Sequence, residues 1–346
     1  MRLLGRTMRS NALYFPYIAL PQDSWTTKAL LYWDKLSSIV PMDHLDHPEQ
    51  MSAFMRTLLT EGLVEPVIPA QFIYQVERFD TSFIELIENR LRRTHRIGSG
   101  HDAPHRTTRI HVEKLGEIPR FLVESGLAKQ IDRAWYDVEA SIANQFMSYL
   151  AACLGAIPAV NATPVTDRAI FASNLRPRRL QPARQPLHQH KSREVILRHL
   201  LPTPVGPVEI DKLLSFKQRH GHLLPPLRAS VEAHCTQVAM LQDENDRIEA
   251  NEAFLLDSKQ KIAEIEDAMR PTFGKVVFGS LAPLFGAGLA VQATDPGNKV
   301  GYAGAALSLS GAIYQAISSI RGSRRAVENR PLAYIAHARR EFGPVR

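Results

Sequence analysis

One carboxylate lies among aromatic side chains near the start of the chain, in the sequence Tyr32-Trp33-Asp34. A carboxylate with aromatic neighbours is a setting in which a general acid or base is found. Acid–base catalysis needs a partner group, however, and this carboxylate has none beside it in the sequence. We therefore interpret Trp25 and Trp33 as core residues, and Asp34 as a residue that faces water or caps backbone groups.

The thirteen histidines are the next candidates for chemistry, as metal ligands. Those within 95–111 and 188–190 are irregularly spaced and have arginine neighbours, which repel a divalent cation. His44 and His47, each next to an aspartate, form a better arrangement, but it is not a recognised ligand spacing. We expect no metal site and no other cofactor.

Motifs for a nucleophile or a bound phosphate are missing from the sequence: it has no Gly-x-Ser-x-Gly, no Walker-type loop and no Gly-x-Gly-x-x-Gly. Cys153 and Cys235 cannot form a disulfide framework, which is typical of a reducing cytosol. Residues 1–20 contain no apolar run of secretory length. We expect a cytoplasmic protein, we name no catalytic residue, and we leave enzyme activity undecided while favouring a non-enzyme.

The positive charge is concentrated in three segments. Residues 90–111, 176–199 and 321–346 together carry +16 of a chain whose net charge is +7, so the remainder is −9. The first two segments lack aromatic residues on which bases stack, so they indicate phosphate contacts rather than base recognition. A solvated arginine-rich loop is the alternative. The candidate anion-binding residues are Arg92, Arg93, Arg96, Arg106, Arg178 and Arg179.

Two apolar runs near the C-terminus form the most distinctive feature of the sequence. Residues 276–294 and 300–320 contain no charged residue, and a short turn at 295–299 separates them. Each run is long enough to cross a bilayer as a helix, and cationic residues flank both outer ends. A hairpin buried in a helical bundle has the same composition, so both interpretations stay open, as does a bundle that releases its hairpin. The large apolar residues of the hairpin are Val276, Val277, Phe278, Leu281, Leu284, Phe285, Leu289, Leu307, Leu309, Ile313 and Ile317.

The elements that position these residues are mostly helices. Residues 12–18 and 110–112 have the aromatic and β-branched content of short strands. A helix begins at Asp23 or Ser24, and its apolar positions are spaced by four, four and three residues up to Leu36. Apolar periodicity predicts further helices over 48–61, 70–93, 117–128, 134–154 and 209–221.

The fold class predicted from these elements is mainly α. We expect an N-terminal helical domain with a few short strands (1–173), followed by a basic linker rich in Pro, Arg and His (174–193). A C-terminal helical domain (194–346) follows, with one long helix over 226–270 and the apolar helical hairpin over 276–320.

The opening of the chain resembles the start of a family of bacterial domains of unknown function that is frequent in actinobacteria. Members share a Tyr-Pro-Tyr…Trp…Leu-Tyr-Trp-Asp…Val-Pro pattern, which is present here over residues 14–41. Residues 61–67 extend the likeness, so it covers about the first seventy residues. The resemblance implies a bacterial cytoplasmic protein and brings no activity with it.

These observations predict a non-enzymatic bacterial protein that acts through a protein partner or self-association and through its apolar hairpin. Membrane association of 276–320 would make it a membrane-active effector in stress or phage defence. The alternative is a module that binds nucleic acid or another polyanion through the basic segments 90–111 and 176–199.

Overall fold

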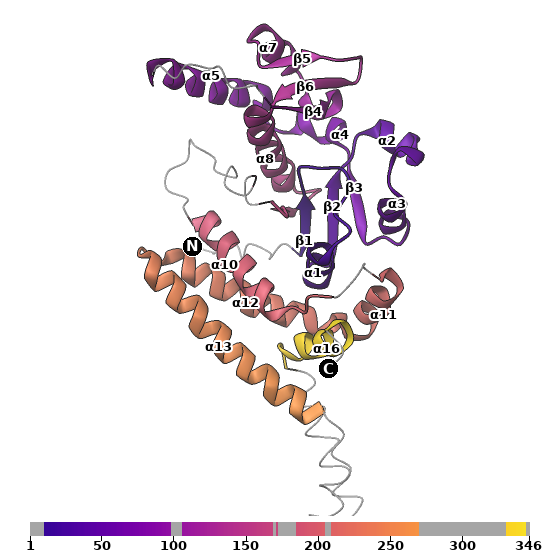
Figure 1. The fold of residues 1–346 in the computed structure, drawn as a ribbon, viewed down its shortest axis with the longest axis vertical. Coiled ribbons are helices and arrows are strands. Elements are labelled where there is room, and N and C mark those ends of the chain that lie inside the picture. Colours follow the sequence, from indigo (N-terminus) through magenta and orange to yellow (C-terminus); the bar gives the residue numbers. More distant parts are fainter. Residues whose placement is uncertain are drawn as a thin grey trace, which may run out of the picture.

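The computed structural model describes residues 10–97, 106–168, 171, 185–204, 209–269 and 330–343. Within them a parallel sheet lies between helices, a smaller antiparallel sheet lies at one end, and C-terminal helices lie at the other (Figure 1). The hairpin expected over 276–320 lies outside the described residues, as do Arg178 and Arg179.

Four parallel strands form the central sheet of the described chain, in the order β3-β2-β1-β7. They are β1 (Asn11–Tyr14), β2 (Lys35–Ile39), β3 (Val64–Val67) and β7 (Ala162–Val165). Asn11 of β1 pairs with Lys35 on one side and with Ala162 on the other. The expected class, mainly α, is therefore wrong, because the protein is a mixture of helices and two sheets.

The error in the predicted fold class arises at the end of the first helix. Helix α1 (Ser24–Tyr32) begins at Asp23, whose carboxylate accepts the backbone N–H of Trp25 at 2.9 Å. The apolar spacing continues to Leu36, but the helix stops at Tyr32 and β2 starts three residues later. Ser38 lies buried within β2, where its hydroxyl donates to the Ile18 carbonyl at 2.6 Å. Tertiary pairing with β1 thus overrides the helical pattern.

A second sheet is antiparallel, with β6 (Trp135–Glu139) between β4 (Thr107–His111) and β5 (Ala128–Gln130). The helix expected over 134–154 begins only at Ala140, as α8 (Ala140–Ala156), because Trp135 to Glu139 pair with β4. The remaining N-terminal helices connect the strands. They are α2 (Met42–Asp46), η1 (Pro48–Gln50), α3 (Ala53–Thr60), α4 (Pro69–Phe72), η2 (Ile73–Gln75), α5 (Phe79–Ile97), α6 (Val112–Leu115) and α7 (Pro119–Glu124).

The described C-terminal part is helical. The helix expected over 226–270 is two helices, because the backbone turns at 241–243 and the Asp243 carboxylate accepts the Asn245 N–H at 2.7 Å, which starts a new helix. The linker expected over 174–193 contains the start of another helix. The elements are α10 (Gln185–Leu200), α11 (Ile210–His220), η3 (Gly221–Leu223), α12 (Leu224–Met240), α13 (Glu244–Met269) and α16 (Ala333–Phe342).

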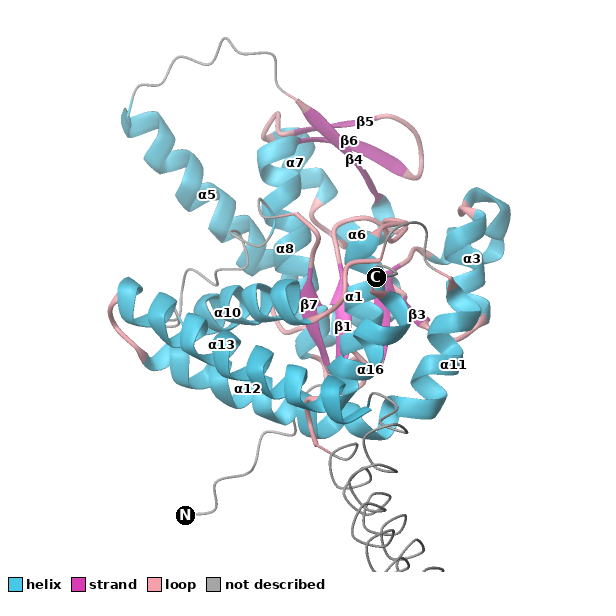
Figure 2. Ribbon diagram, turned by 60° about the horizontal axis from the view of Figure 1, so that its bottom comes forward, coloured by secondary structure: helices cyan, strands magenta, loops and turns pink. Residues whose placement is uncertain are grey.

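Strand β1 separates two hydrophobic cores. Its residues Ala12 and Tyr14 belong to one core, and Leu13 belongs to the other, as alternation along a strand requires. The first core joins α1 to the C-terminal helices, for example to Leu227 of α12. Figure 2 shows α1 and these helices on one side of the sheet. The segment 174–193 therefore does not separate two independent cores.

Two cations of the C-terminal helices bind the end of α1. The ammonium of Lys217 donates to the carbonyls of Leu30 and Trp33 at 2.9 and 2.8 Å. The guanidinium of Arg228 donates to the Tyr32 carbonyl at 2.9 Å and to the Asp34 carboxylate at 2.8 Å. The last carbonyls of a helix lack partners within it, so these side chains supply the missing donors.

We expect Arg228→Met to lower the free energy of unfolding by about 1–3 kcal/mol, because the buried Tyr32 carbonyl loses its donor. Urea unfolding followed by circular dichroism measures the change. The control is Arg219→Met, which breaks an exposed pair with Glu341 and should change stability by less than about 1 kcal/mol. Equal effects of the two substitutions would contradict the structural role of Arg228.

Candidate functional site

The parallel sheet has a topological switch point, at which the chain continues to strands on opposite sides of β1. Strands β2 and β3 lie on one side of β1, and β7 lies on the other. In open α/β sheets, ligands bind beyond the carboxyl ends of the strands at such a point. Here this end is formed by the residues that follow Tyr14 and Val165, where the Phe15 N–H donates to the Val165 carbonyl at 3.2 Å.

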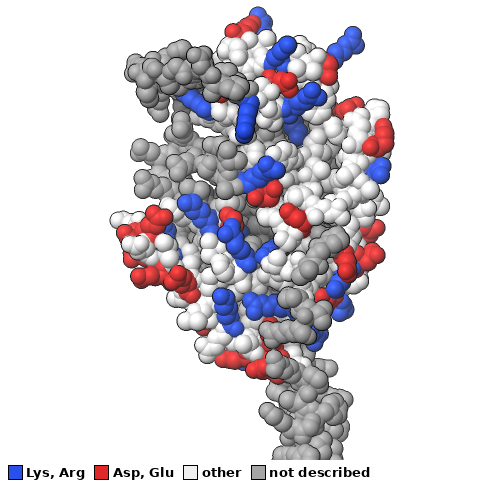
Figure 3. Space-filling view, in the orientation of Figure 1, with Lys and Arg blue, Asp and Glu red and all other residues white. Residues whose placement is uncertain are grey.

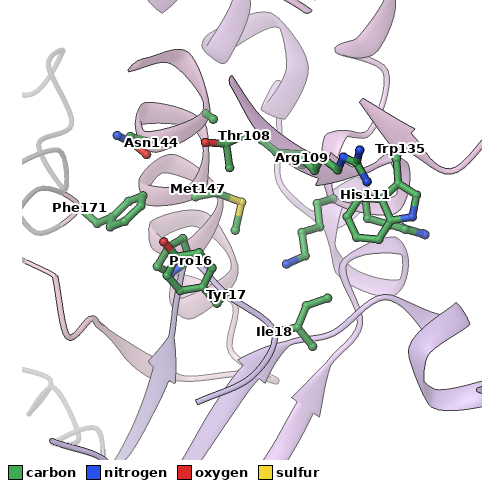
Figure 4. A pocket seen from close by; sticks show the side chains of 13 residues that line it. Pro16, Tyr17, Ile18, Thr108, Arg109, His111, Trp135, Asn144, Met147 and Phe171 are labelled. Carbon is green, nitrogen blue, oxygen red and sulfur yellow. The ribbon is translucent and has the colours of Figure 1, made fainter. Parts of the chain in front are cut away.

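A cavity of about 230 Å³ opens at this edge, and we call it the carboxyl-edge cavity. Its walls come from the segment after β1, from β4 and β6, and from α8. Figure 4 shows Tyr17 and Phe171 on one side and His111 and Trp135 on the other. The lining residues are Pro16, Tyr17, Ile18, Thr108, Arg109, Ile110, His111, Lys114, Trp135, Ala143, Asn144, Met147 and Phe171.

The wall of the carboxyl-edge cavity is basic. Arg109 and Lys114 line it, whereas none of its lining residues in the described chain is Asp or Glu. Asp137 lies outside the lining, 3.5 Å from Nε of Arg109, and the Arg109 side chain remains 70% exposed. Neutral donors are present as well, in Thr108 and Asn144.

His111 presents a donor to this cavity. Its ring is buried, and Nδ1 accepts the backbone N–H of Glu113 at 3.3 Å, which leaves the proton on Nε2. Nε2 has no hydrogen-bond partner among the described residues. Burial lowers the pKa of His111, so the ring is neutral at neutral pH. The wall of the cavity therefore contains a neutral imidazole whose N–H is buried and has no acceptor among the described residues.

An aromatic cluster holds the His111 ring. The Trp135 ring meets it edge to face, with ring centroids 5.1 Å apart. His44 of α2 lies behind, with its centroid 6.0 Å from that of His111. The carboxylate of Glu113 accepts the Met42 N–H at 2.8 Å and so fixes α2 against α6. These contacts leave His111 little freedom to rotate away from the cavity.

Lys114 is the least expected residue of the wall. Its side chain is only 4% exposed, and no ion pair or hydrogen bond joins its ammonium to the described residues. Burial lowers the pKa of Lys114 from 10.5 to about 7. A substantial fraction of the amine is therefore uncharged at neutral pH.

A second cavity of about 330 Å³ lies between α1 and α10, on the other face of the sheet. Its cations already have partners. Arg193 donates to the Glu232 carboxylate at 2.5 Å, and Arg198 donates to Glu194 at 2.6 Å. The carboxyl-edge cavity, which has an unpaired amine and an unpaired N–H, is the stronger candidate.

Electrostatics elsewhere on the molecule do not single out another site. Figure 3 shows Lys and Arg side chains along the middle of one face and acidic side chains over the N-terminal end of α13.

In the described part of the chain, no three His, Cys, Asp or Glu side chains gather as metal ligands would. None of its helices is both long enough and apolar enough to cross a membrane.

The candidate anion-binding residues can be placed only in part. Arg92 is exposed on α5 and pairs with Glu88 at 3.3 Å. Arg106 is exposed just before β4. The side chains of Arg93 and Arg96, which also belong to α5, lie outside the described residues, as does segment 176–184. The polyanion-binding surface therefore stays a prediction.

Sequence reasoning missed the carboxyl-edge cavity. It did not single out Lys114, it included Arg109 only within the basic segment 90–111, it dismissed His111 for irregular spacing, and it placed Trp135 in a helix. The available signal was the short strand predicted at 110–112, which contains His111 and is followed two residues later by Lys114. This signal points to a site only when the parallel sheet is known, because ligands bind at the carboxyl edge of such a sheet.

Comparison with known proteins places the chain in no family. No protein-family model, no curated protein and no solved structure matches it. The likeness of the first seventy or so residues to a bacterial family of unknown function thus stays a prediction, and the chemistry of the carboxyl-edge cavity is the basis for inferring function.

Proposed function

We propose that the protein binds a small organic anion in the carboxyl-edge cavity. The observation that carries this proposal is the buried amine of Lys114, which has no partner among the described residues. A buried cationic group is unfavourable unless it is paired, and a bound carboxylate or phosphate would supply the pair.

The other groups of the wall support the same ligand class. Arg109 adds a second positive charge, and the Nε2–H of His111 adds a directed donor. Tyr17, Trp135 and Phe171 provide apolar surfaces for the remainder of the molecule. A volume of about 230 Å³ suits a small metabolite, since pockets for drug-sized ligands range from about 300 to 1,000 Å³.

The cost in stability of burying the Lys114 amine also favours a functional role for this residue. A group with a strongly shifted pKa in a cavity is a frequent feature of functional sites. Replacing the amine with an apolar side chain of similar length should stabilise the fold, as happens when a strained functional residue is removed.

We expect Lys114→Met to be more stable than the wild type, with the largest difference below about pH 7. The pKa of Lys114 is lower in the folded protein than in the unfolded chain, so the unfolded chain binds more protons between about pH 7 and 10.5. The free energy of unfolding of the wild type therefore rises with pH across that interval. As it rises, the stability advantage of Lys114→Met over the wild type should become smaller.

Urea unfolding at about pH 6 and about pH 9.5 measures this effect. Lys129→Met, at an exposed position of β5, is the matched control and should show no pH-dependent difference from the wild type. A difference between Lys114→Met and the wild type that is the same at both pH values would show that Lys114 titrates normally.

Calorimetric titration with a panel of small carboxylates and phosphates tests binding itself. We expect at least one member to bind, and Lys114→Met or His111→Phe to weaken it about tenfold or more, which corresponds to about 1.4 kcal/mol. Lys129→Met should bind as the wild type does. The proposal fails if no member binds, or if both cavity variants retain the full affinity.

A second proposal concerns protein partners and membranes, and it rests on the two charge-free runs of 276–320. Apolar side chains that α12 and α13 expose support a protein partner or self-association: Met240 is 64% exposed, and Leu256 is 72% exposed. In this proposal the protein is cytoplasmic and associates with membranes through the hairpin.

Sedimentation with vesicles of increasing anionic lipid content tests the hairpin. We expect the wild-type protein to sediment with the vesicles and Gly304→Arg to remain in the supernatant, because Gly304 lies within the run 300–320 and a charge inside the bilayer is unfavourable, by roughly 2.5–3.5 kcal/mol at its centre. Expression and melting of the variant are compared with those of the wild type. A wild-type protein that stays in the supernatant at every composition would rule out membrane association.

A further inference from the structure

Lys114 lies in the wall of the carboxyl-edge cavity, and its amine has no counter-ion among the residues that the structure describes. Lys114 belongs to α6, and His111 is the N-cap residue directly before this helix, where its Nδ1 accepts the Glu113 N–H. One turn of helix therefore supplies two of the polar groups that line the cavity, an amine and an imidazole N–H. A purely electrostatic anion site has no need for a lysine that is only 4% exposed, since an exposed lysine or arginine attracts anions as well.

We propose that Lys114 is a nucleophile that forms an imine with a small oxo acid bound in the carboxyl-edge cavity. This inference rests on the proposed function, because the cavity must first hold the acid. An amine reacts with a carbonyl group only in its neutral form, and desolvation in an apolar wall is a known way to obtain that form near neutral pH. The pKa of about 7 agrees with this requirement.

The neighbouring residues suit the two ends of such a substrate. The Nε2–H of His111 donates to the carbonyl oxygen, on which negative charge develops during the attack. The guanidinium of Arg109, which lines the same cavity, pairs with the carboxylate. The aromatic wall exposes no acidic group that would repel the substrate.

The step balances without an oxidant or a metal. The lone pair of the Lys114 nitrogen forms a bond to the carbonyl carbon, and the π electrons of the carbonyl move to its oxygen, which takes up a proton. The nitrogen then loses a proton, which gives a carbinolamine. Protonation of the hydroxyl and its departure as water give a protonated imine, which loses its N–H proton to give the imine, so the net change is the release of one water molecule.

Reductive trapping tests the proposal on the full-length protein. The protein is incubated with glyoxylate, pyruvate or 2-oxobutyrate and with sodium cyanoborohydride, which reduces an imine irreversibly to a secondary amine. Peptide mass spectrometry then locates the adduct. We expect modification of Lys114 to exceed that of exposed Lys129 at least tenfold.

Lys114→Arg separates a nucleophile from a positive charge, because it keeps the charge but cannot form an imine under these conditions. We expect this variant to lose trapping at the cavity, and the wild type to bind lactate, the alcohol analogue of pyruvate, without forming an adduct. Lys129→Arg should be trapped at Lys114 as the wild type is.

The outcomes distinguish the two proposals. Binding of the acids without an adduct at Lys114 overturns the imine and leaves the anion site intact. Absence of binding by every acid, including lactate, overturns both. Adducts that form equally on Lys114 and Lys129 reflect general lysine reactivity and overturn the imine assignment.

Discussion

The end of helix α1 is the point on which the arrangement of the sheet depends. Its last carbonyls are bound by Lys217 and Arg228, which belong to helices far away in the sequence. Because these donors replace the N–H groups of a further helical turn, the chain can leave the helix at Tyr32 and begin β2 at Lys35. This early exit gives β2 its place beside β1, and β1 in turn defines the carboxyl edge at which the cavity opens.

The two faces of the sheet have different roles. The face that carries Ala12 and Tyr14 is covered by α1 and the C-terminal helices, where Arg193 pairs with Glu232. The face that carries Leu13 packs on α8 and on the second sheet. Near that second sheet the packing is incomplete, and the gap has a basic wall. The helical half thus stabilises the sheet, and the antiparallel sheet shapes the site.

Sequence patterns predict local features of this fold better than its topology. The cap at Asp23 and the helix that stops at Gly62 follow from local rules, and the structure shows both near the expected positions. The exit from α1 does not follow from such rules, because Trp33 and Leu36 continue the helical spacing and the groups that end the helix come from Lys217 and Arg228. If β2 is not predicted, the parallel sheet cannot be predicted either. Without the sheet, the sequence gives no reason to assign Lys114 to a site.

Two buried lysines show how a structural cation differs from a functional one. Burial lowers the pKa of both, that of Lys217 to about 8 and that of Lys114 to about 7. Lys217 donates to three backbone carbonyls and lies near Asp34, so its place in the fold is fully explained by the groups around it. Lys114 has no such acceptors within the described chain, and it lines the cavity. An unpaired buried amine lowers the stability of the fold, and in our proposal a ligand bound in the cavity compensates for that cost.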